Sequence, residues 1–176
     1  MEEKTLCRRA FLSSSAAVAL GAGAGAGARP AIASDLGAEF KFEVTRSDAA
    51  WREMLTQEEY NILRKGSTEL PNTSPLVNET ADGIYCCKGC DLTIYESTWK
   101  VPLDIGWVFF SHAVPRSVLT GIDGEPPSGM GDDIVPAMIE VHCRRCASHL
   151  GHIVVAEGKL VHCINGAALT FDRARA

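Results

Sequence analysis

Hydrophobic and polar positions divide the chain into a short helical part and a longer part with the pattern of strands. From Ser47, a residue type that caps helices, Trp51 and Leu55 recur at a spacing that places apolar side chains on one helix face. The sequence of residues 56–59 (TQEE) has the form of a capping box and predicts a second helix, which Gly66 can end. Two consecutive short helices are therefore expected.

Beyond residue 83 no helical period remains, and short apolar runs alternate with turns rich in Gly, Pro and Asp. Such spacing is typical of antiparallel strands. Residues 67–82 read as an ordered connector, and residues 115–136 read as a long loop of the kind that often carries function. The pattern predicts a mainly β fold of small antiparallel sheets with the two helices at its N-terminal edge. The expected strands lie at 92–95, 107–110, 138–141, 152–155, 160–164 and 168–171.

The first part of the chain has the composition of an export signal. A pair of arginines at 8–9 precedes a weakly apolar Ala/Gly run, which ends in a small-x-small cleavage site at 31–33 (AIA). The other interpretations are a membrane anchor or a disordered tail, but residues 21–28 (GAGAGAGA) are too weakly hydrophobic for a stable spanning helix. We therefore expect a twin-arginine signal at 1–33 and one exported, periplasmic or extracytoplasmic domain at 34–176, with no stable membrane anchor after cleavage.

Charge excludes some classes of partner. The whole chain has 17 Lys and Arg against 22 Asp and Glu, a net charge of −5. Removal of the first 33 residues takes away four basic and two acidic residues, which leaves a net charge of −7. An acidic domain of this kind is not expected to bind nucleic acid or an anionic membrane surface.

Four of the cysteines form two C-x-x-C pairs, Cys87 with Cys90 and Cys143 with Cys146. Two residues between thiolates let the chain turn back so that both sulfurs face one ion, and two such pairs make the tetrahedral four-sulfur set that zinc prefers. The alternatives are two local disulfides, one disulfide with a free pair, or a thioredoxin-like redox pair. A closed four-thiolate zinc site would stabilise the fold and take no part in catalysis.

Two cysteines of the expected mature domain lie outside these pairs, Cys86 and Cys163. A cysteine in a strand can be a small buried apolar residue or a nucleophile. His149 and His152 precede Cys163 in the sequence, and the short loop between them would bring Cys163 back alongside the two histidines. Asn165 follows Cys163 by two residues and would share its strand face. An imidazolium beside a thiol lowers the pKa of the thiol and can then donate a proton. Both interpretations of Cys163 stay open at this point.

Residues 142–154 (HCRRCASHLGHIV) and 161–171 (VHCINGAALTF) resemble the C-terminal signature of the type B methionine sulfoxide reductases, also described as SelR-like domains. The resemblance continues upstream through residues 47–69 and through residues 84–100 (IYCCKGCDLTIYESTWK). It therefore covers nearly the whole expected mature domain. It implies a β-tent fold of the Mss4-like type and an oxidoreductase that repairs methionine-R-sulfoxide, protein-bound or free, under oxidative stress.

The resemblance also implies site roles, and these fall on residues of this sequence. Cys163 matches the nucleophile, which attacks the sulfoxide sulfur and becomes a sulfenic acid. His149, His152 and Asn165 match its catalytic partners, and Trp107 matches the wall that holds the substrate's methyl group. A thioredoxin-like protein or a small thiol would regenerate the nucleophile. The implied ligands of a structural Zn²⁺ are Cys87, Cys90, Cys143 and Cys146.

The sequence departs from the family pattern in the walls of the pocket. Ile105 stands where many members have a resolving cysteine, and Val161 stands where an arginine is usual. Residues 108–110 (VFF) replace Pro-Ser-Phe, and the loop at 155–158 is shortened. The alternatives to a reductase are a non-catalytic binding module on the same zinc-stapled scaffold and a thiol-dependent enzyme for another small substrate.

Overall fold

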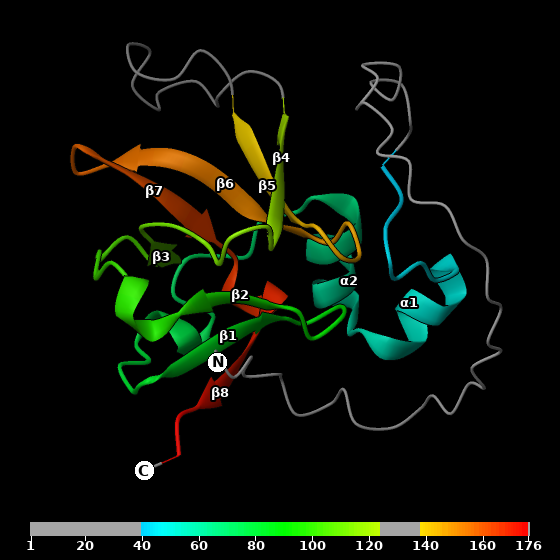
Figure 1. The fold of residues 1–176 in the computed structure, drawn as a ribbon, viewed down its shortest axis with the longest axis horizontal. Coiled ribbons are helices and arrows are strands. Elements are labelled where there is room, and N and C mark those ends of the chain that lie inside the picture. The colour runs from blue at the N-terminus through cyan, green and yellow to red at the C-terminus, as the bar shows by residue number, and fades with distance from the viewer. Residues whose placement is uncertain (1–39, 124–137, 176) are drawn as a thin grey trace, which may run out of the picture.

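A computed structural model describes residues 40–123 and 138–175 of the chain (Figure 1). The two predicted helices are present: α1 spans Asp48–Met54 and α2 spans Gln57–Lys65. Thr56 and Glu59 form the reciprocal hydrogen bonds of a capping box, and Gly66 ends α2 in the left-handed conformation with φ of 69°. The expected signal at 1–33 lies outside the described residues. No helix in the described part of the chain is long and apolar enough to span a membrane.

The remainder is two antiparallel sheets, so the prediction of a mainly β fold is confirmed. The smaller sheet has the order β2-β1-β8 and the larger has the order β3-β7-β6-β5-β4. The strands are β1 (Gly83–Cys87), β2 (Thr93–Glu96), β3 (Val108–Phe110), β4 (Val118–Ile122), β5 (Ile139–Cys143), β6 (His149–Ala156), β7 (Lys159–Ile164) and β8 (Leu169–Arg173). Single-turn 3-10 helices connect them at η3 (Pro75–Val77), η4 (Ser97–Trp99) and η5 (Gly166–Ala168).

The segment 115–136 is not all loop, which corrects the sequence prediction. It contains β4, which pairs with β5 from Val118 opposite Cys143 to Ile122 opposite Ile139. Gly121 and the neighbouring turn residues hide the alternating pattern of this strand, and tertiary pairing overrides that weak local preference. Residues 124–137 lie outside the described part of the chain.

Two apolar clusters fill the fold, one on each face of the larger sheet. The main cluster joins both sheets to the helices, and Val108, Phe110 and Ile164 belong to it. In Figure 1, α2 lies beside the larger sheet, next to η5. The second cluster is small: Leu103, Phe109 and Val161 are buried in it, with Trp107 and Cys163 among the partly buried residues packed against them. Because successive strand residues point to opposite faces, β3 and β7 contribute side chains to both clusters.

Candidate active site and metal centre

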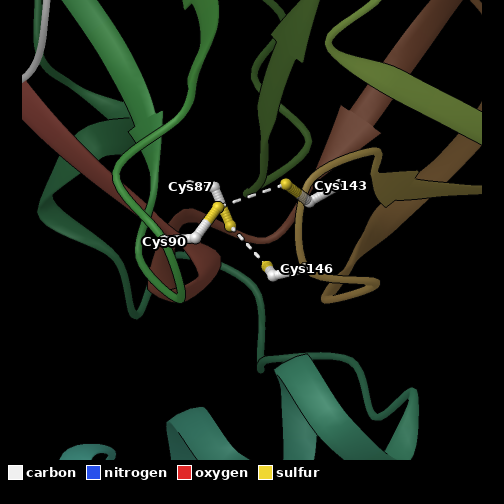
Figure 2. A group of neighbouring side chains, drawn as sticks. All are labelled: Cys87, Cys90, Cys143 and Cys146. Carbon is white, nitrogen blue, oxygen red and sulfur yellow. Dashed lines mark hydrogen bonds between the residues drawn. The ribbon is translucent and has the colours of Figure 1, made fainter. Parts of the chain in front are cut away.

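Figure 2 shows the four cysteines of the two C-x-x-C pairs gathered at one point between the sheets. Cys87 ends β1 and Cys143 ends β5, and Cys90 and Cys146 lie in the turns that follow. The two turns have the same form. Asp91 N donates to Cys87 O at 2.8 Å and Ala147 N donates to Cys143 O at 2.9 Å, and both residues have positive φ. The repeated turn aims the sulfurs of both pairs at a common centre.

The four sulfurs fit a tetrahedral metal site. All lie within 4.8 Å of one another, with 3.7 Å between Cys87 and Cys146 and 3.5 Å between Cys90 and Cys143. A tetrahedron with Zn–S distances of about 2.3 Å has sulfur–sulfur edges of about 3.8 Å. The cysteines are free thiols, so the structure does not contain the local disulfides considered above. The cluster could therefore hold a metal ion.

Cys163 lies on β7, which is flanked by β3 and β6 in the larger sheet. It lies directly opposite Phe109 on β3 and opposite His152 on β6, and His152 in turn lies opposite Glu140 on β5. Directly opposed residues of antiparallel strands share a face and bring their side chains close together. Cys163, His152 and Glu140 therefore form one row across the sheet.

His149 and His152 both lie in β6. In a regular strand, residues three apart point to opposite faces. Here the pairing of β5 with β6 shifts register between Val141 and His142, as in a β-bulge, and one strand gains a residue relative to the other. The imidazole rings consequently lie near each other, with centroids 5.2 Å apart, while Leu150 is buried in the main core.

Each histidine is paired with a carboxylate that the sequence reasoning missed. Nδ1 of His149 donates to Glu140 Oε1 at 2.7 Å, and Nε2 of His152 lies 2.9 Å from Asp123 Oδ2. The signal available for Glu140 was a lone acidic residue at an alternate position of an apolar strand, Ile139–Cys143. No signal marked Asp123, which follows β4 and meets His152 only through the tertiary fold.

The hydrogen bond from His149 to Glu140 fixes the tautomer of the imidazole ring. A carboxylate can only accept, so Nδ1 carries the proton and Nε2 is the second ring nitrogen. Nε2 is buried and has no hydrogen-bond partner in the described part of the chain. Burial lowers the pKa of His149, and the hydrogen bond to Glu140 acts in the opposite direction. His149 is therefore neutral at pH 7, with Nε2 available to accept a proton.

The Cys163 thiol is protonated at rest. It is partly buried, burial raises its pKa to about 12, and the negative charge of Glu69 acts in the same direction. The sequence had suggested an imidazolium that lowers this pKa. The structure differs because the thiol is buried against apolar side chains and Glu69 adds a negative charge, and both disfavour the thiolate. Any reaction at this sulfur must include removal of its proton.

Trp107 is held at the edge of the apolar cluster that contains Cys163. Its indole Nε1 donates to the backbone oxygen of Glu69 at 3.2 Å. The preceding Gly106 has φ of 98°, and a Cβ there would lie 2.6 Å from Pro71, so only glycine allows this close approach of the two segments. The structure thus packs Trp107 and Cys163 against the same apolar cluster.

Asn165 lies outside β7 and does not continue its face, contrary to the sequence expectation. It precedes η5 and is buried. Its Oδ1 accepts from Glu69 N at 3.0 Å, and its Nδ2 donates to Leu150 O at 3.1 Å. Both ends of the amide are occupied by backbone groups, so in this structure Asn165 ties segments together. Cys86 lies in β1 of the smaller sheet, fully buried, with its sulfur 3.8 Å from Thr93 Oγ1.

The sequence was also compared with known proteins. The model of the SelR domain matches residues 55–173. A protein from Arabidopsis thaliana named peptide methionine sulfoxide reductase B3 is 33% identical over 148 residues, which are 81% of this chain and 78% of that protein. One from Agrobacterium fabrum, peptide methionine sulfoxide reductase MsrB, is 38% identical over 74% of this chain and 93% of its own length. One from Leptospira interrogans with the same name is 33% identical over 75% and 98%.

Among solved structures, the Mis18 Yippee-like domain has a TM-score of 0.44 and 17% identity, covering 54% of this chain and 99% of that domain. The family match covers most of the described domain, including both cysteine pairs and the row that carries Cys163. The chain belongs to the SelR domain family.

Proposed function

We propose that this protein is a methionine sulfoxide reductase that acts on the R epimer and uses Cys163 as its nucleophile. The names of the related proteins support the reaction. The observation that carries the proposal is the position of Cys163: it packs with Trp107 in one apolar cluster and lies directly across the strand pair from His152. The apolar cluster can pack against the methyl group of the substrate, and His149 and His152 can form hydrogen bonds with the sulfoxide oxygen.

The reaction transfers oxygen from one sulfur to another. The Cys163 sulfur bonds to the sulfoxide sulfur as the thiol loses its proton, and the sulfoxide oxygen accepts a proton. The hydroxyl then passes from the methionine sulfur to the Cys163 sulfur as the bond between the two sulfurs breaks, so methionine is released reduced by two electrons and Cys163 becomes a sulfenic acid. We assign both proton transfers to the pair His149 and His152, with Nε2 of His149 as the acceptor.

Regeneration requires thiols from outside the site. One reductant thiol attacks the sulfenic sulfur, water leaves, and a mixed disulfide forms; a second thiol then releases Cys163 as the free thiol. The reductant is a thioredoxin-like protein or a small thiol. Ile105 occupies the position of the resolving cysteine of many members, so the step cannot use a thiol at that position.

We propose that the metal of the four-cysteine site is zinc and that its role is structural. The sulfur–sulfur distances fit its tetrahedral geometry, and four thiolates leave no open position for substrate or water. The ion holds the turn after β1 against the turn after β5, which joins the two sheets.

The surface beside Trp107 favours a protein-bound substrate. Leu70 is 73% exposed and Ile105 is 41% exposed, and they lie on the two segments that Trp107 Nε1 and Asn72 N join by hydrogen bonds. Free methionine sulfoxide offers nothing for two exposed aliphatic side chains to bind, whereas a peptide does. Leu70→Ser with Ile105→Ser should lower kcat/KM for a peptide with apolar neighbours and leave that for free methionine sulfoxide unchanged; equal losses would contradict this.

We also propose export through the twin-arginine pathway, as the arginine pair at 8–9 and the cleavage site at 31–33 suggest. Replacement of both arginines by lysine should leave the full-length precursor inside the cell. Mature protein that still appears outside the cytoplasm would contradict the proposal.

One observation favours a second function, a non-catalytic binding module. The high pKa of Cys163 is what a merely packed thiol would show. The decisive test is turnover by the purified mature domain with dithiothreitol. The reductase reduces the R epimer and not the S epimer, and Cys163→Ser abolishes this. No turnover of either epimer, together with a Cys163 inert to alkylation, would favour the binding module.

A further inference from the structure

Glu69 is a buried carboxylate with a role that the reaction above does not use. It is 4% exposed, belongs to the connector after α2, and reaches the turn η5 with its side chain. Its Oε1 accepts from Gly166 N at 2.7 Å and its Oε2 accepts from Ala167 N at 2.8 Å. These donors follow Cys163 by three and four residues, so the side chain holds the segment that leaves the proposed nucleophile.

The backbone of the same residue reaches the substrate wall. Glu69 O accepts the hydrogen bond from Trp107 Nε1, and Glu69 N donates to Asn165 Oδ1. One residue therefore connects the aromatic wall on one side with the chain after Cys163 on the other. Trp107 and Cys163 belong to segments far apart in sequence. Glu69 is hydrogen-bonded both to Trp107 and to the turn that follows Cys163.

A carboxylate is a costly choice if the position served only to fill the core. Burial of a charge is unfavourable unless hydrogen bonds satisfy it, and an apolar side chain of similar volume often stabilises a fold equally well. What the carboxylate adds is geometry, because two charge-assisted hydrogen bonds from adjacent amides fix both the position and the orientation of the turn. Fixation of this kind matters where two segments far apart in sequence must together hold one substrate.

We propose that Glu69 is a positioning residue that sets the placement of Trp107 relative to Cys163. The assignment rests on the proposed function, since it concerns the same site. Glu69 touches neither the reacting sulfur nor the substrate; it acts through Trp107 and through the turn after β7. Its charge has a second effect: burial is the main reason that the pKa of Cys163 is raised, and the negative charge of Glu69 acts in the same direction.

Two substitutions separate the reach of the side chain from its charge. Glu69→Gln removes the charge and turns an amide NH₂ toward a backbone N–H, whereas Glu69→Asp keeps the charge and shortens the reach. Both should raise KM for a methionine-R-sulfoxide peptide about tenfold, with kcat within about threefold, because the methyl-binding wall moves. At pH 8 the rate of iodoacetamide alkylation of Cys163, followed by peptide mass spectrometry, should rise about threefold only in Glu69→Gln.

A double-mutant cycle tests whether the effect passes through Trp107. In a Trp107→Ala background, Glu69→Gln should change KM by less than about twofold. Acrylamide quenching of Trp107, isolated by subtraction of a Trp107→Phe reference, should increase in both Glu69 variants. Quenching and alkylation do not depend on turnover, so they decide the role of Glu69 even if the wild-type protein reduces no sulfoxide.

Three results would overturn the proposal: unchanged KM and quenching in a folded variant, additive effects in the cycle, or equal alkylation rates in Glu69→Gln and Glu69→Asp. If Glu69→Gln does not fold, the KM and quenching of Glu69→Asp decide the outcome.

Discussion

Gly151 offers the sharpest test of the sheet geometry that places Cys163 beside His152. It lies on β6 at the point where β7 comes nearest, and a Cβ added there would lie 2.1 Å from the carbonyl oxygen of Cys163 and 2.9 Å from Cα of Ile164. Real Cβ atoms essentially never come within 3.0 Å of another heavy atom, so β7 must move by about 1 Å in Gly151→Ala. The neighbouring atoms are backbone and have no rotamer through which to escape.

Such a shift moves the nucleophile away from its histidine partner. We expect kcat/KM for methionine-R-sulfoxide to fall about a hundredfold, the cost of a displacement of about 1 Å at a reaction centre. Overpacking should also lower the free energy of unfolding by about 1 to 3 kcal/mol, and it should lower Tm by about 3 to 10 °C. Steady-state kinetics and thermal unfolding followed by circular dichroism measure the two effects.

Gly121→Ala is the matched control. It introduces the same methyl group on the same sheet, where the nearest atom would be Glu140 Oε2 at 3.9 Å, an ordinary contact. Its activity should stay within about twofold of wild type and its Tm within a few degrees. Full activity in Gly151→Ala, or equal losses in both variants, would refute the argument that the spacing of β6 and β7 sets the reaction geometry.

Three further predictions follow from the same structure. Glu140→Gln should lower kcat about tenfold or more with little change in KM, because a neutral amide holds the Nδ1–H tautomer of His149 less firmly and does not stabilise the imidazolium that forms when Nε2 accepts a proton; an unchanged kcat would remove that role. Burial lowers the pKa values of His149 and His162 in the folded protein, so on acidification the unfolded chain binds protons before the folded one does. The contribution of these two residues to the free energy of unfolding is therefore fully present above the unfolded pKa of about 6.5, and it is lost as pH falls through the lower folded values. Tm should therefore fall between pH 7.5 and pH 5 with metal content checked in parallel, and it should fall less in His162→Gln, which keeps a partner for Tyr95. The native protein should contain one zinc per chain. Removal of this metal by a chelator, or Cys90→Ser, should lower the free energy of unfolding by an amount on the order of 10 kcal/mol and leave the domain unfolded. A folded, active apo-protein would contradict a structural zinc.

Local patterns predicted the elements whose signals lie within a few residues. The capping box at Thr56 and the glycine after α2 marked the second helix, and the paired C-x-x-C spacing predicted the cluster of four sulfurs. These features depend on short-range turn geometry, which sequence encodes directly. The same is true of the alternation that identified most strands of the larger sheet.

Features that depend on register or on distant partners could not be predicted in this way. His149 and His152 share a face only because the pairing between β5 and β6 shifts in register. The sequence of residues 149–152 (HLGH) does not predict this shift. The partnership of Asp123 with His152 requires β4 to be placed at the edge of the sheet. Asn165 has the spacing of a site residue, yet its amide is occupied by Glu69 and Leu150. Spacing gives candidates, and only the fold shows which groups remain available.

The most direct test of the central claim is a single turnover without reductant. Reduced mature protein, freed of excess thiol, is mixed with methionine-R-sulfoxide, and the methionine formed is counted while dimedone traps any sulfenic acid. We expect one methionine per chain and a dimedone adduct on Cys163 alone. No methionine, with Cys163 still present as a free thiol, would contradict it.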